Sequence, residues 1–206
     1  MLSAMAVLTV AADLGTGGDE IAGRVAEATG LALVDREALV SLAQEMDPAF
    51  RDVADADELE ERVGGRLNAL ALGLAMTAGS PDAFRELRFR QALPEIARRV
   101  LAQAIAQPSV ILASAAFAAL ADHPAAVHAR LRAPRDWRVE MHHRRNVIDH
   151  AAAERAVRHD DHLKRAWVRE LYGADIDDPA QFGIVLDASC LPDERVAHVL
   201  AAAIGG

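Results

Sequence analysis

The chain has 206 residues, 52% hydrophobic and only 4% aromatic side chains, and a formal net charge of −9, which argues against binding to nucleic acid polymers or anionic membranes. No apolar run approaches the roughly 20 residues of a membrane span, so no membrane association is expected. The single cysteine, Cys190, is typical of a reducing compartment, and we expect a cytoplasmic protein with one domain over 1–206.

The first quarter of the chain alternates strand and helix patterns around a glycine turn. The apolar segment 5–12 predicts a strand that is buried on both faces, and Gly15, Gly17 and Gly18 then permit a tight turn. The elements that follow are a helix over 19–29, a short strand over 31–34 and a helix over 36–46. A strand, a glycine turn and a helix form the layout of a phosphate-binding loop, although Gly18 stands where the Walker pattern has lysine.

The segment 47–106 interrupts this alternation with two long helices, predicted over 57–78 and 83–106. Pro94 predicts a kink or a break in the second of them. The first becomes apolar all round after an acidic start, which is typical of a helix buried in the core or against a second subunit. The helices within 57–106 are therefore the candidate surface for a homodimer.

Beyond the insertion the alternation resumes. Strands are predicted over 110–113, 126–131 and 184–187, and helices over 115–121, 135–145, 150–172 and 192–204. The order predicts an α/β fold with an open parallel sheet of about five strands, flanked by helices.

These motifs together resemble the cytidylate kinase-like family of P-loop nucleoside monophosphate kinases over nearly the whole chain. The stretch from Ala11 to Ala22 follows the spacing of the family's glycine-rich element, and the run from Leu33 to Leu39 is similar to its Asp-Lys/Arg-Glu element. Further along, the matching positions are Val127 to Pro134, Asp161, Lys164, Trp167, Arg169, Tyr172-Gly173 and Asp177-Asp178-Pro179. The resemblance rests on several elements in the same order.

The resemblance implies a P-loop kinase fold in which the insertion 47–106 closes over a monophosphate and a lid, 135–172, carries cations. The implied activity is transfer of the γ-phosphoryl group of ATP to a nucleoside monophosphate, with Mg²⁺. The implied nucleotide-binding residues are Gly15, Thr16, Gly17, Gly18 and Asp35. The catalytic cations implied by matching positions are Arg138 and Lys164.

Three departures from the family pattern remove positive charge where phosphates are expected. Ala11-Ala12 replaces a Ser-Arg pair, Asp19 replaces an arginine, and Ala113-Ser114-Ala115 replaces Gly-Arg-Gly. Asp19 favours the helix dipole but opposes a bound phosphate. The sequence therefore supports two hypotheses: a nucleoside monophosphate kinase, active or weakened, and a catalytically inactive kinase-fold module with a binding or regulatory role.

Several of these residues also have an ordinary structural interpretation. Asp35 is a favoured residue for capping the helix that follows it, and Thr16 is an ordinary turn hydroxyl. The lid cations lie among acidic residues, which is typical of a solvated, salt-bridged helix face. His159 and His162 share a helix face, but no second ligand pair has a standard spacing, so no metal site is predicted.

Overall fold

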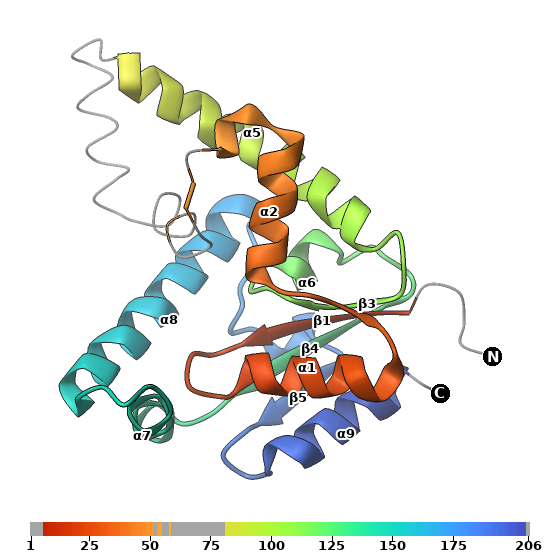
Figure 1. The fold of residues 1–206 in the computed structure, drawn as a ribbon, viewed down its shortest axis with the longest axis vertical. Coiled ribbons are helices and arrows are strands. Elements are labelled where there is room, and N and C mark those ends of the chain that lie inside the picture. Colours follow the sequence, from red (N-terminus) through yellow and green to blue (C-terminus); the bar gives the residue numbers. More distant parts are fainter. Residues whose placement is uncertain (1–5, 52, 55–57, 59–80, 205–206) are drawn as a thin grey trace.

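The computed structural model describes residues 6–51, 53–54, 58 and 81–204. Five strands form one sheet, and every neighbouring pair is parallel. The spatial order is β2-β3-β1-β4-β5 (Figure 1). The strands are β1 (Val7–Ala12), β2 (Ala32–Val34), β3 (Ser109–Leu112), β4 (Ala126–Arg132) and β5 (Ile184–Asp187). This confirms the predicted five-stranded α/β architecture.

Alternation along the central strand builds a core on each side of the sheet. Leu8 and Val10 pack with α1 (Gly18–Thr29) and α9 (Asp193–Ile204), which cover one face. Val7 instead joins a cluster with residues of α5 (Pro81–Ala104) and α6 (Ala116–Ala119). The central strands are apolar at nearly every position because both faces of a parallel sheet are covered.

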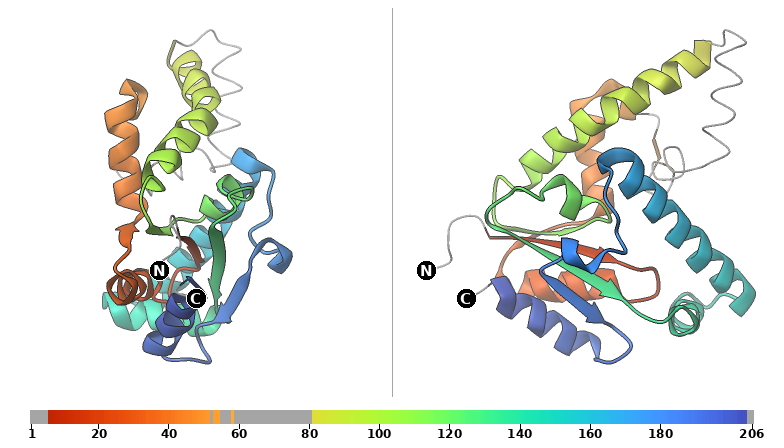
Figure 2. Two further views of the ribbon diagram at one scale, coloured as in Figure 1. Left: turned by 90° about the vertical axis from the view of Figure 1, so that its right-hand side faces the viewer. Right: turned by 180° about the vertical axis from the view of Figure 1, so that it is seen from behind.

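A third cluster lies away from the sheet, where α2 (Arg36–Met46) and α5 stand side by side (Figure 2). Phe50 and Phe89 meet there with ring centroids 4.9 Å apart. The helix α5 continues through Pro94 without a break, and Leu93 and Ile96 on either side of Pro94 are buried in this cluster. The predicted helix over 57–78, with its share of the candidate dimer surface, lies outside the described residues apart from position 58.

Two helices join β4 to β5 and complete the fold: α7 (Arg135–Asn146) and α8 (His150–Tyr172). They occupy the segment 135–172, whose role as a lid stays a prediction, and Val139 packs on Ala153 and Val157 between them. The side chain of Asp149 caps the start of α8 by accepting a hydrogen bond from the amide of Ala152. Among the described residues, no helix is long and apolar enough to cross a bilayer.

Candidate functional site

The glycine turn between β1 and α1 has the shape that the sequence predicts. Gly15 (φ 92°) and Gly17 (φ 80°) adopt left-handed backbone conformations, which glycine reaches without a steric penalty. A Cβ on Gly18 would lie 2.5 Å from the Cβ of Ala12, so only glycine fits there. Thr16 is buried, and its hydroxyl donates to the carbonyl of Asp13 (2.7 Å). Thr16 therefore closes the turn, as the structural interpretation predicts.

This turn opens on a cavity of about 270 Å³, called here the glycine-loop cavity. All three glycines that were predicted to bind a nucleotide, Gly15, Gly17 and Gly18, line this cavity. The charged residues of its lining are three cations and four carboxylates: Arg36, Arg145 and Lys164, against Asp13, Asp19, Glu20 and Asp160. Asp19 is one of these carboxylates. The loop therefore keeps the predicted shape, but the side chains that line its cavity carry more negative than positive charges.

Lys164, one of the two predicted catalytic cations, lies in this cavity. Its ammonium group donates to the carbonyl of Ala12 (2.8 Å) and pairs with Asp160 (2.9 Å). Both members of this ion pair are nearly buried, and the bond to Ala12 ties α8 to the end of β1. An ammonium group has three donors, so Lys164 can keep both contacts and still donate to an anion in the cavity.

Arg138, the second predicted cation, is held in a buried ion-pair network below the loop. Its guanidinium makes a bidentate contact with Asp161 (2.8 and 2.9 Å) and lies 3.9 Å from Asp13. Burial by itself lowers the pKa of Arg138, but the hydrogen bonds to Asp161 and the charges around it raise the pKa overall. Arg130 also pairs with Asp13 (2.6 Å), so Asp13 anchors two arginines.

Arg138 is not among the described residues that line the glycine-loop cavity. Its backbone carbonyl instead faces Gly15, where an added Cβ would lie 2.4 Å from that oxygen. The geometry thus makes Arg138 a support for the loop, and contact between Arg138 and a phosphate stays a prediction.

Asp35 caps α2, accepting a hydrogen bond from the amide of Ala38 (2.8 Å). It does not belong to the described lining of the glycine-loop cavity, and its part in nucleotide binding also stays a prediction. The neighbouring Arg36 does line the cavity. His142 lines the cavity too, and burial lowers its pKa. The described part of the chain holds no group of three or more His, Cys, Asp or Glu that could bind a metal ion.

Arg145 is a site residue that sequence reasoning did not single out. Its guanidinium pairs with Asp193 at the start of α9 (2.9 Å) and lies 3.9 Å from Glu20. It presses on Gly17, where a Cβ would be 2.4 Å from one guanidinium nitrogen. The signal in the sequence was only a run of basic residues at the end of a predicted helix, and nothing in that run distinguished Arg145 from Arg144.

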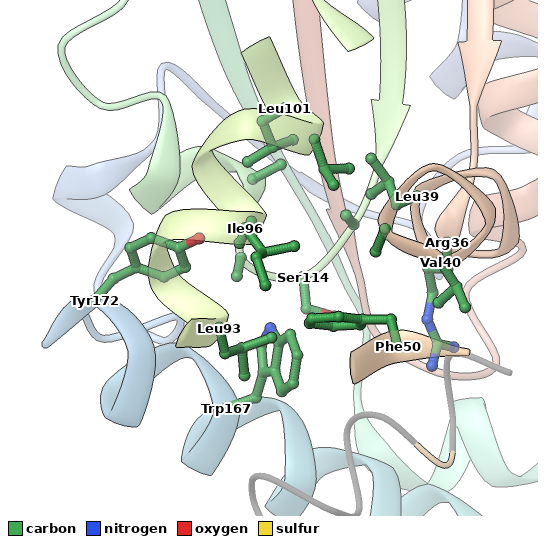
Figure 3. A pocket seen from close by; sticks show the side chains of 16 residues that line it. Arg36, Leu39, Val40, Phe50, Leu93, Ile96, Leu101, Ser114, Trp167 and Tyr172 are labelled. Atoms are coloured by element: carbon green, nitrogen blue, oxygen red, sulfur yellow. The ribbon is translucent and has the colours of Figure 1, made fainter. Parts of the chain in front are cut away.

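Two further cavities adjoin this centre. Arg145 also lines an open cavity of about 540 Å³ that includes Trp137, Met141 and the loop 188–192. On the other side, Arg36, Ala113 and Ser114 line both the glycine-loop cavity and an apolar cavity of about 100 Å³ between α2, α5 and α8 (Figure 3). The three cavities therefore lie next to one another at the carboxyl ends of the strands, where open α/β sheets bind ligands.

The family model of the cytidylate kinase-like family matches residues 7–190. The chain belongs to this family. Its membership supports a nucleotide-binding, kinase-like function. No curated protein sequence matches the chain.

Solved structures share the fold at low sequence identity. An uncharacterized protein from Eubacterium ventriosum is 15% identical, with a TM-score of 0.65 and 98% of each chain covered. TT1252 from Thermus thermophilus is 19% identical, with a TM-score of 0.52 and 98% of each chain covered. Shikimate kinase from Acinetobacter baumannii, solved in complex with shikimate, is 13% identical, with a TM-score of 0.50 and coverage of 98% of this chain and 94% of its own. These likenesses establish the P-loop kinase fold.

Proposed function

We propose that this protein binds the triphosphate of ATP at the glycine loop and transfers its γ-phosphoryl group slowly. The observation that carries the proposal is the retained loop, whose left-handed Gly15 and Gly17 open on a cavity that also receives Lys164 and Arg145. Amide groups at the start of α1 and the helix dipole favour an anion there, even without a Walker lysine. The cavity beside Trp137, which shares Arg145, is the place for the nucleotide base.

Mg²⁺ fits this site by its donor set. Asp19 and Glu20 are among the residues that line the cavity, and one or two carboxylates together with phosphates are the usual ligands of Mg²⁺ in kinases. Bound Mg²⁺ would neutralise charge on the phosphates. Because the lining holds more carboxylates than cations, we expect ATP to bind far better with Mg²⁺ than without it.

A second candidate function, that of a catalytically inactive binding or regulatory module, is favoured by the state of the predicted catalytic cations. Arg138 forms ion pairs with Asp161 and Asp13, and Lys164 forms an ion pair with Asp160. Phosphoryl transfer depends on cations that stabilise developing charge, so cations already neutralised by carboxylates stabilise it less. A nucleoside monophosphate as acceptor stays a prediction, and Ser114 stands where the family has the arginine for its phosphate.

One pair of measurements separates the two functions. Calorimetry measures ATP binding with and without Mg²⁺, and a coupled assay measures ADP release over a panel of nucleoside monophosphates. Saturable binding with turnover supports the slow kinase. Saturable binding without turnover supports the inactive module, and absence of binding at millimolar Mg²⁺–ATP contradicts both.

Asp19→Arg tests the charge of the loop directly. We expect this variant to bind ATP about fivefold more tightly in the absence of Mg²⁺, since reversing an exposed charge near a phosphate changes the binding free energy by about 1 kcal/mol. Glu27→Arg, an equally exposed change at the far end of α1, is the control for net charge. Equal affinities for the two variants would show that Asp19 does not act on the phosphates.

A further inference from the structure

The apolar cavity beside the glycine-loop cavity is called here the apolar pocket. Its wall comes from α2, Phe50, α5, the segment after β3 and α8 (Figure 3). Carbon atoms dominate the lining, with Leu39, Val40, Leu93, Ile96, Val100 and Leu101 as its aliphatic part. Phe50, Trp167 and Tyr172 add three aromatic rings.

This lining does not suit a nucleoside monophosphate. The phosphate would bring about two negative charges, and Arg36 is the one cation among the described residues of the wall. A base in the pocket would lie among side chains such as Leu93, Ile96 and Val100, and each polar atom of the base left unpaired there would cost several kcal/mol. The chemistry of the pocket therefore calls for a ligand that is mostly carbon.

Three polar atoms of the wall set a further requirement. The three groups are the hydroxyl of Ser114, the indole N–H of Trp167 and the hydroxyl of Tyr172, which all belong to residues that line the pocket. Burial raises the pKa of Tyr172, so its hydroxyl stays protonated and able to donate at neutral pH. All three groups are hydrogen-bond donors, and a ligand that satisfies them must carry an acceptor.

Ser114 stands at the boundary of the two cavities, since it lines both of them together with Arg36 and Ala113. An acceptor atom beside Ser114 would therefore face the glycine-loop cavity, while the rest of the ligand lies among the apolar side chains. The apolar pocket has a volume of about 100 Å³, which is enough for one ring, because apolar cavities of this order of size bind benzene. The rings of Phe50 and Trp167 favour aromatic contacts over aliphatic ones.

We infer that the apolar pocket binds a small molecule with one aromatic ring and an oxygen substituent, of the phenol or benzoate class. The inference goes beyond the proposed nucleotide site, and its test needs neither ATP nor phosphoryl transfer. It predicts selectivity for a single ring over a nucleoside monophosphate.

Tryptophan fluorescence tests this binding without any enzymatic readout. The chain has two tryptophans, so Trp137→Phe leaves Trp167 as the only tryptophan emitter. We expect phenol and benzoate to change the emission of Trp167 saturably in the millimolar range or below, and CMP to leave it unchanged. No saturable change with either aromatic probe would overturn the inference, and so would competition by CMP at similar concentration.

Two variants in this background locate the binding. Ala97→Leu adds a larger side chain to the wall of the pocket and should abolish the response, whereas Ala102→Leu, on the exposed side of the same helix, should leave it intact. Tyr172→Phe removes one hydroxyl and should weaken binding about fivefold, with unchanged urea unfolding as evidence of folding. An unaltered response in both Ala97→Leu and Tyr172→Phe would contradict binding in this pocket.

Discussion

Arginines in the lid region have roles that their positions in the sequence do not reveal. Arg138 is buried and makes a bidentate contact with Asp161, whereas Arg135, one turn earlier on α7, meets Glu154 (3.4 Å) with both side chains nearly half exposed. Arg145 near the end of the same helix packs on Gly17. Burial decides the difference, because a charge removed from water needs a fixed partner and an exposed one does not.

Arg138→Ala is predicted to destabilise the fold, because it leaves the carboxylate of Asp161 buried without its partner. We expect the free energy of unfolding in urea to fall by about 3 to 5 kcal/mol. Arg135→Ala, which removes an exposed pair from the same helix, should cost less than about 1 kcal/mol. Similar losses for the two variants would show that the buried network contributes no more than a surface pair.

The glycine loop and α1 form an element in which each glycine has its own constraint. Gly15 combines a left-handed backbone with the close approach of the Arg138 carbonyl. Gly23, inside α1, has no neighbouring atom within 4 Å of the place where a Cβ would be, and its φ is not positive. Glycine is therefore required by the backbone geometry at Gly15, whereas at Gly23 it only weakens the helix.

Alanine substitutions at these two glycines are predicted to act in opposite directions. Gly15→Ala should lower the free energy of unfolding by at least about 2 kcal/mol, since it adds left-handed strain to a steric clash. Gly23→Ala should raise it by about 0.5 to 1 kcal/mol, since alanine loses less backbone entropy in a helix. Thermal and urea unfolding measure both, and equal effects would contradict the left-handed geometry of the loop at Gly15.

On the scale of the whole molecule, α8 connects parts that are distant in the sequence. Lys164 reaches the end of β1, Asp161 holds α7, and Trp167 packs on the cluster between α2 and α5. A second connection crosses the sheet, where the hydroxyl of Thr9 on β1 meets the ring of His128 on β4 (2.8 Å). Burial, together with the nearby His123, lowers the pKa of His128 below its ordinary value of 6.5.

This lowered pKa predicts a dependence of global stability on pH. The unfolded chain binds the His128 proton more tightly than the folded chain does, so the contribution is complete above about pH 6.5 and is lost as the pH falls below it. His128→Gln should therefore lose less stability than the wild type between pH 7 and pH 5.5, as measured by urea midpoints. His198→Gln, an exposed change on α9, should follow the wild-type curve.

Local patterns in the sequence were sufficient to predict the helices and strands and their order along the chain. The apolar run of β1, the glycines of the turn and the spacing of later motifs predicted the parallel sheet, the helices over 135–172 and the family. The helix-cap interpretation of Asp35 also followed from its place before a helix, and the hydrogen bond from Ala38 confirms that cap. Patterns of this kind are readable because helix and strand periods, turns and caps depend on residues close together in the chain.

The sequence by itself determined the fold class, the shape of the glycine loop and the missing arginines around it. Only the tertiary structure decided what the remaining charges do. It placed Arg138 in a network with Asp13 and Asp161, brought Arg145 onto Gly17, and set Ser114 between an acidic cavity and an apolar one. The physical reason is that ion pairing and desolvation depend on distances between side chains that are far apart in the chain, as Arg130 and Asp13 are.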